Sequence, residues 1–170
     1  MRRALSRKRW TVIFLAVLAA WAAYWPYPRL ELSSRGLRSP LYLALPNRHQ
    51  FRVVYRDMKT GKTENRRFRI LRDGKILFFE TDYLYPAPAL ASTFPPEDVS
   101  HRKGILIVRV HCAPVPALHF ALTPGQERIL WLGGHRKVDL NSRFPENSLV
   151  TLRVIHKPLL FFLWQTSRFH

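Results

Sequence analysis

The chain has 170 residues, of which 47% are hydrophobic and 13% aromatic. This length and composition are enough for one domain with a substantial core, which excludes a disordered tail. There are 28 Lys and Arg residues against 11 Asp and Glu, a net charge of +17 that predicts an anionic partner, and the single cysteine excludes an intrachain disulfide and a cysteine-rich zinc site.

The amino-terminal stretch is typical of a membrane-targeting segment. A basic cap over residues 1–9 precedes a charge-free apolar run over residues 10–25. As a helix this run would be roughly 24 Å long, short against a hydrocarbon core of about 30 Å. Its ends carry the aromatic side chains expected at a membrane interface, namely Trp10, Trp21, Tyr24 and Trp25. We therefore predict an uncleaved signal anchor over residues 10–27.

Two other interpretations of this stretch stay open. Ala20, Trp21 and Ala22 form a small-residue pattern around which a signal peptide is cleaved. The run also has the composition of a buried helix in a soluble domain. For an anchor, the basic cap predicts a cytoplasmic amino terminus in a bacterial inner membrane, a linker over residues 28–40 and an extracytoplasmic domain over residues 41–170.

The remaining chain alternates between apolar and polar residues, a pattern typical of half-buried strands. The expected strands cover residues 41–45, 50–56, 65–71, 75–81, 104–111, 117–122, 128–132, 135–140 and 148–156. Asp73-Gly74 and Gly133-Gly134 predict hairpin turns, and four prolines within residues 83–96 predict a loop. Seven to nine strands without a long helical pattern predict an antiparallel β-sandwich or a partly open barrel.

Basic residues crowd the first predicted strands, and several of them would share a sheet face. The candidate binding residues are Arg52, Arg56, Arg67, Arg69, Arg72 and Lys75, with Arg66 among them in the sequence. Such a surface would bind lipid headgroups, an acidic partner or an anionic ligand. The alternative is a solvated outer face whose charges prevent aggregation.

The six apolar residues at 159–164 are too few to span a bilayer. They would dip into a membrane surface, dock a partner helix or form a last buried strand.

Catalytic signals are weak. His111, Cys112 and His119 could be combined into a thiol–imidazole or metal site, but period two would place His111 and Cys112 on opposite strand faces. Glu80 and Asp82 would share a face, where partnership with the arginines is a more economical role than acid–base chemistry. We expect no catalytic residue, no metal site and no cofactor.

The order of features resembles small exported proteins encoded beside TAXI-type TRAP transporters. The matching stretches are residues 51–55, 68–80, 135–140 and 152–158. A His-Ser-Val motif of that family is replaced here by Arg56, Asp57 and Met58, and a Gly-Ala-Gly-like loop is replaced by residues 86–90. The resemblance implies a transport-associated accessory role.

The sequence thus predicts a non-catalytic, single-pass accessory protein of the bacterial envelope, associated with a solute transporter of the TRAP type. Its expected partners are membrane lipids and a transporter or another envelope protein, with no nucleic acid. A small envelope hydrolase or transferase and a binder of anionic lipid surfaces are the alternatives.

Overall fold

The computed structural model describes residues 2–35, 39–84, 95, 98–133, 136–158 and 160–161, with the backbone alone for residues 2–9, 11, 22 and 47. The chain forms two compact units. One comprises Met1–Arg29 with Ile155–His170, and the other comprises Leu30–Val154.

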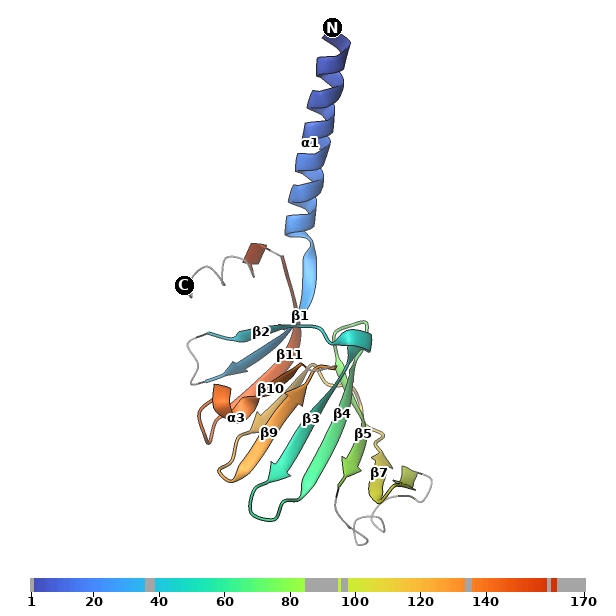
Figure 1. Cartoon of the computed structure of the whole chain (residues 1–170), viewed down its shortest axis with the longest axis vertical. Coiled ribbons are helices and arrows are strands. Elements are labelled where there is room, and N and C mark those ends of the chain that lie inside the picture. Colours follow the sequence, from blue (N-terminus) through green and yellow to red (C-terminus); the bar gives the residue numbers. More distant parts are fainter. Residues whose placement is uncertain are drawn as a thin grey trace. The chain divides into compact units, whose positions relative to one another are not determined.

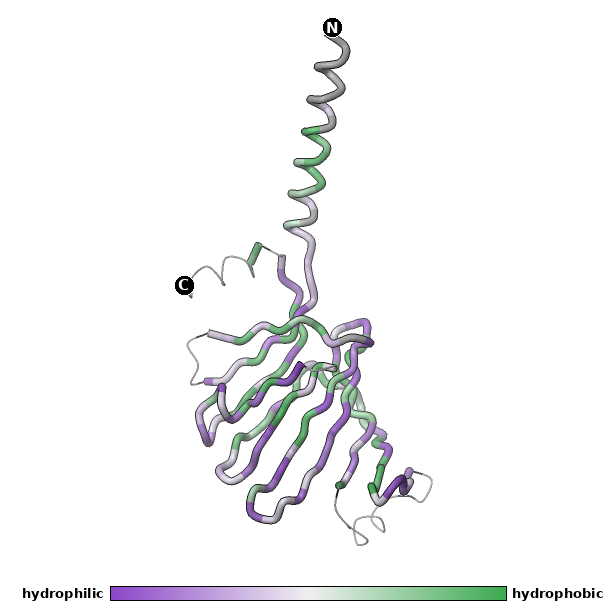
Figure 2. The backbone as a smooth tube through the Cα atoms, in the orientation of Figure 1, coloured by the Kyte–Doolittle hydropathy of each residue, from purple (hydrophilic) through white to green (hydrophobic). Residues whose placement is uncertain are grey.

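Helix α1 (Arg2–Tyr24) contains the apolar run in its second half (Figure 2). It ends before Pro26, because the residue preceding a proline is disfavoured in a helical conformation. Large apolar side chains along this helix are exposed, including Phe14 at 65% and Val17 at 62% of their full area. No helix within the described residues combines the length and hydropathy of a membrane-spanning segment.

The strands form two antiparallel sheets, as predicted for a β-sandwich (Figure 1). The small sheet has the order β2 (Leu41–Ala44), β1 (Pro26–Ser34), β11 (Leu149–Pro158), β8 (Ala117–Ala121). The large sheet has the order β10 (Lys137–Asp139), β9 (Gln126–Trp131), β3 (Gln50–Asp57), β4 (Thr63–Ile70), β5 (Ile76–Tyr83), β7 (Ile105–Arg109), β6 (Val99–Arg102). Two short helices, η1 (Asn47–His49) and α3 (Leu140–Arg143), complete the described elements.

The hydrophobic core lies between the two sheets. Leu30, Val150 and Leu152 from the small sheet are fully buried in one cluster with Val53 and Leu130 from the large sheet. Burying each of these side chains contributes about 1.5–3 kcal/mol relative to exposure. Packing of alternate residues from both sheets therefore explains the sandwich.

Helix α3 directly follows β10 and is hydrogen-bonded to β9. Its N-cap is Asp139, whose Oδ1 accepts the backbone N–H of Asn141 at 2.9 Å. The side chain of Asn141 in turn bonds β9, accepting from the backbone N–H of Arg128 at 2.8 Å and donating to the Gln126 carbonyl at 2.7 Å. These bonds fix the backbone from the Gln126 carbonyl to the Arg128 N–H.

The structure corrects the predicted linker over residues 28–40. Strand β1 occupies Pro26–Ser34, and Leu30 and Leu32 within it are completely buried. Pro26 and Pro28 made this stretch look like a linker in the sequence. They are compatible with a strand because they lie at its beginning, where a missing N–H is tolerated. Strand β6 was also missed, since the polar residues of Val99–Arg102 show no apolar alternation.

Both predicted hairpins are confirmed by antiparallel pairing, of β4 with β5 and of β9 with β10. Gly74 takes the positive φ of 81° that the first turn requires. The second turn includes Gly134 and His135, which lie outside the described residues. Most of the predicted loop over residues 83–96 and most of the apolar run at 159–164 also lie outside them.

Candidate anion-binding pocket

Three neighbouring strands change from apolar to charged along one face of the large sheet. Directly paired residues share a face, and Val53 on β3 pairs with Arg66 on β4 and with Leu130 on β9. One step further, Tyr55 pairs with Glu64 and with Arg128. The face that carries the core therefore continues into a cluster of one phenol, two guanidinium groups and one carboxylate.

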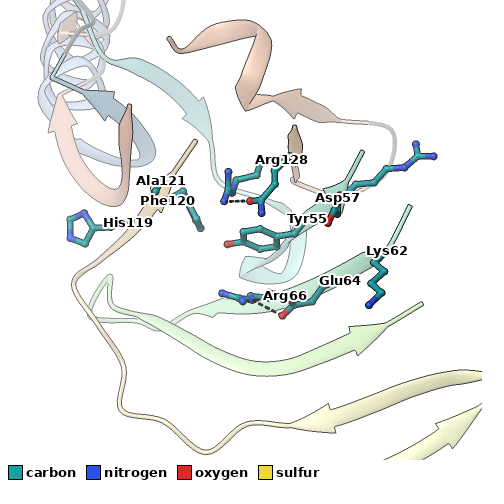
Figure 3. Close-up of a pocket in the computed structure, with 11 residues that line it drawn as sticks. Tyr55, Asp57, Lys62, Glu64, Arg66, His119, Phe120, Ala121 and Arg128 are labelled. Atoms are coloured by element: carbon teal, nitrogen blue, oxygen red, sulfur yellow. Dashed lines mark hydrogen bonds and ion pairs between the residues drawn. The ribbon is translucent and has the colours of Figure 1, made fainter. Parts of the chain in front are cut away.

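This cluster lines a cavity of about 410 Å³ on the core side of the large sheet, next to strand β8 (Figure 3). Its lining comprises Tyr55, Arg56, Asp57, Lys62, Glu64, Arg66, His119, Phe120, Ala121, Gln126 and Arg128. Arg56 lies on the rim, with its side chain directed to the outer face; of the other lining residues Lys62, Arg66 and Arg128 are cationic and Asp57 and Glu64 are carboxylates, so the cavity has a positive surplus. Such a surplus favours an anionic occupant.

Arg128 is the most unusual member of the lining. Its side chain is buried, with 7% of the residue's area exposed. Its Nη2 donates to Gln126 Oε1 at 2.8 Å, whereas Nε and Nη1 are buried without a hydrogen-bond partner. Among the described residues, no carboxylate lies within ion-pair distance of this guanidinium. Burial lowers the pKa of Arg128 from its usual value, although arginine stays protonated near neutral pH.

The Tyr55 ring lies between the two guanidinium groups of the pocket. The Cζ atom of Arg66 is 4.6 Å from the ring centroid, and that of Arg128 is 5.3 Å away. Burial raises the pKa of the Tyr55 hydroxyl, and the charges of Arg66 and Arg128 oppose this rise. Cation–π contact thus orients both arginines without neutralising them.

Arg66 differs from Arg128 in having a counter-ion. Its Nε donates to Glu64 Oε1 at 2.7 Å, and the same carboxylate oxygen accepts the hydroxyl of Thr81 at 3.2 Å. Burial by itself lowers the pKa of Arg66, but the hydrogen bond and charge of Glu64 outweigh this effect and raise the pKa overall. The charge that remains unbalanced in the pocket is therefore that of Arg128.

The predicted basic stripe occupies the opposite face of the same sheet. Pairing of β3 with β4 places Arg52, Arg56, Arg67 and Arg69 on one outer face, which confirms that several of these cations share a face. Arg56 lies 4.0 Å from Glu127, and Arg67 bonds Glu80 and Asp82, each at 2.7 Å. The Glu80 and Asp82 prediction is confirmed in this respect, since both carboxylates pair with an arginine of the stripe.

The remaining stripe residues lie over aromatic rings or in the hairpin turn. Arg52 lies 4.7 Å from the centroid of Trp131, and Arg69 lies 5.1 Å from that of Phe79. Lys75 pairs with Asp73 at 3.0 Å, and Arg72 is exposed in the same turn. The predicted interface residues Trp10, Trp21, Tyr24 and Trp25 are all exposed on or just after α1. Binding by either set stays a prediction.

The three residues considered for catalysis each contact a different partner and do not bond one another. His111 Nε2 lies 2.8 Å from Asp98 Oδ1, Cys112 Sγ bonds the Phe78 carbonyl at 3.2 Å, and His119 Nδ1 lies 3.1 Å from Thr151 Oγ1. Cys112 and His119 line a common cavity, but no hydrogen bond joins them. In the part of the chain that the structure describes, no three His, Cys, Asp or Glu residues form a group suited to a metal.

Sequence reasoning missed Tyr55 and Arg128 as site residues. A signal was present on β9, where Arg128 occupies the same alternation as the buried residues Leu130 and Leu132. A charged residue at an inward position of an apolar strand is expected to have a partner or a function.

Comparisons with known proteins do not assign the chain to a group. No protein-family model matches it, and neither a curated protein nor a solved structure shows significant similarity. The resemblance to exported proteins beside TAXI-type TRAP transporters therefore stays a prediction.

Proposed function

We propose that this protein is a non-catalytic binding module, tethered to a membrane by α1, whose sandwich captures an anionic group at Arg128. The tether places the module in the bacterial envelope, where an anion-binding accessory protein suits a solute transporter. The enzyme alternative has less support, because both pocket carboxylates are engaged: Glu64 bonds Arg66 and Thr81, and Asp57 accepts the backbone N–H groups of Lys59 and Thr60.

The observation that carries the proposal is the unpaired guanidinium of Arg128. Two of its polar nitrogen atoms, Nε and Nη1, are buried without partners. Leaving a buried polar group unsatisfied costs roughly 1–3 kcal/mol, and more for a charged one. A carboxylate oxygen is a strong acceptor for a guanidinium N–H, so it can satisfy one of these donors. An anionic ligand would thus remove a cost that the empty protein bears.

A thermal-shift measurement tests this binding. The probe is sodium acetate added to the full-length chain in zwitterionic nanodiscs, with sodium chloride at equal ionic strength as reference. Acetate should raise the melting temperature, because a ligand that binds the native state alone stabilises it. The rise should vanish in Arg128→Met and persist in the matched variant Arg52→Met, whose side chain lies over Trp131 on the outer face. Equal shifts in all three proteins would contradict the proposal.

Membrane tethering is supported by the exposed apolar side chains of α1. They point in all directions around the helix rather than along one stripe, which is typical of a helix surrounded by lipid. The charge-free run of 16 residues gives roughly 24 Å of helix, and its basic and aromatic flanks would snorkel to the interfaces.

A pair of reporter fusions at the carboxyl end tests the tether and its direction. Alkaline phosphatase should be active and green fluorescent protein dark if the sandwich lies outside the inner membrane. Replacing Phe14 and Val17 by lysine should release the protein from washed membranes, because each buried lysine costs about 2.5–3.5 kcal/mol at the centre of a bilayer. Active cytosolic fluorescence would contradict the predicted location.

A further inference from the structure

A second cavity adjoins the Arg128 pocket and differs from it in chemistry. It has a volume of about 240 Å³, and its apolar lining includes Phe68, Ile76, Phe78, Val115 and Leu118. The two cavities are adjacent, because Tyr55, Arg66, His119 and Phe120 line both. The molecule thus offers a cationic chamber beside an apolar one, with four residues common to both linings.

The polar groups of the apolar cavity are occupied within the protein. The thiol of Cys112 bonds the Phe78 carbonyl, and the Arg66 guanidinium bonds Glu64. The other polar lining groups are the Tyr55 hydroxyl and His119, whose Nδ1 lies 3.1 Å from Thr151 Oγ1, and the remaining walls are apolar. An apolar chain would therefore gain by leaving water for this cavity.

We propose that the ligand of this protein is an amphipathic monoanion: a carboxylate head on Arg128 and an alkyl chain in the apolar cavity. This inference rests on the proposed anion-binding function and names the class of ligand. The head would accept from Nε or from Nη1 of Arg128, the two buried donors that lack partners, after the side chain turns one of them toward the cavity. These two N–H groups lie on different edges of the guanidinium, so one carboxylate meets only one of them. The chain would pass Tyr55 and Arg66, two of the four residues common to both cavities.

The charges around the head position favour one negative charge over two. Asp57 and Glu64 line the cavity together with three cations, Lys62, Arg66 and Arg128, which leaves one positive charge, and Arg66 is already paired with Glu64. Backbone N–H groups of Thr60 and Lys59 lower the pKa of Asp57 and keep this carboxylate charged. A dianionic phosphate monoester would therefore meet more repulsion than a carboxylate does.

Calorimetric titration with a series of acids tests the proposal. The probes are acetate, butanoate, hexanoate and octanoate, added to the full-length chain in zwitterionic nanodiscs, with Arg128→Met correcting for uptake by the lipid. We expect affinity to rise roughly fourfold for each methylene that enters the cavity. Octyl phosphate, tested at a pH where it is dianionic, should bind more weakly than nonanoate.

The outcomes separate this inference from the proposed function. Equal affinity for acetate and octanoate, lost in Arg128→Met, would keep the anion site and overturn the apolar extension. No binding that depends on Arg128 would overturn both. Tighter binding of octyl phosphate would overturn the carboxylate assignment and point to a phosphorylated lipid.

Variants at Val115 test the apolar cavity without touching Arg128. This side chain lines the cavity and is 38% exposed, so it tolerates replacement better than the buried Ile76. Val115→Trp should fill the cavity and remove the dependence on chain length while acetate still binds. Val115→Thr, a gentler change, should weaken octanoate several-fold and leave acetate unaffected. An unchanged octanoate affinity in both variants would place the chain elsewhere.

Discussion

Arg67 and Arg128 lie on opposite faces of the same sheet and have opposite electrostatic surroundings. Arg67 on the outer face bonds two carboxylates, Glu80 and Asp82, each at 2.7 Å. Arg128 on the inner face is buried deeper, bonds only the neutral side chain of Gln126 and leaves two nitrogen atoms unpaired.

The difference separates an arginine with a structural role from one that we propose binds a ligand. A guanidinium whose carboxylate partners are within the chain stabilises the fold and attracts no further anion. A buried guanidinium without a counter-ion destabilises the empty fold, which is typical of functional sites. High net charge is therefore a poor guide to the site. On the outer stripe Arg56, Arg67 and Lys75 pair with carboxylates, whereas the proposed site lies at a buried arginine without a counter-ion.

The largest expected effect on stability comes from Leu130, the neighbour of Arg128 on the same face of β9. Leu130→Ala should lower the free energy of unfolding by about 3–4 kcal/mol, because Leu130 is fully buried and its removal leaves a cavity. Arg128→Ala should cost far less. Denaturant unfolding measures both. Equal losses would show that Arg128 holds the core as an apolar residue does.

Removing Arg67, which pairs with two carboxylates, should also destabilise the protein. Arg67→Ala leaves Asp82 buried without a cation, and we expect a loss of roughly 2 kcal/mol. Arg69→Ala, at an exposed position on the same strand, should change stability by less than about 0.5 kcal/mol. If both variants unfold at the same denaturant concentration, the Arg67 pairs contribute nothing.

Removing Arg128, which has no counter-ion, should change the free energy of unfolding in the opposite direction. Arg128→Met keeps the length of the side chain and removes the buried charge, so it should raise the free energy of unfolding by about 1 kcal/mol. The same variant should lose binding of acetate. A stabilised variant that no longer binds acetate would support the contrast between Arg128 and Arg67. A strongly destabilised variant would contradict it.

The smallest expected effect concerns the titration of Tyr55. Burial raises its pKa above the usual tyrosine value of about 10, so the native state holds this proton more tightly than the unfolded state does. The stabilisation is complete below that pH and is lost as the pH rises through the native pKa. Phenolate absorbance, compared with Tyr55→Phe, should show a further rise of this pKa in Arg128→Met and no change in Arg67→Ala.

Much of the fold was predictable from local patterns. Alternation located β3, β4 and β5, and the Asp73-Gly74 turn fixed the pairing of β4 with β5. Strand β1 was not predictable, because prolines at its start concealed two buried leucines. Its place between β2 and β11 depends on contacts between distant parts of the chain.

The site was predictable only in part. The sequence indicated that arginines gather on the first strands and that Glu80 and Asp82 pair with them, as the Arg67 contacts confirm. It did not indicate which cation lacks a partner, because that depends on the register of β3 with β4 and β9. Tyr55 and Arg128 are 73 positions apart in sequence and meet only through this pairing.

The most direct test of the central claim observes the unpaired donor itself. The Nε–Hε resonance of Arg128, assigned by its absence in Arg128→Met, can be followed by NMR in the full-length chain while acetate is added. We predict a saturable downfield proton shift and slower exchange with water at Arg128, with no shift at Arg67. An Arg128 resonance that does not respond to acetate would contradict the account.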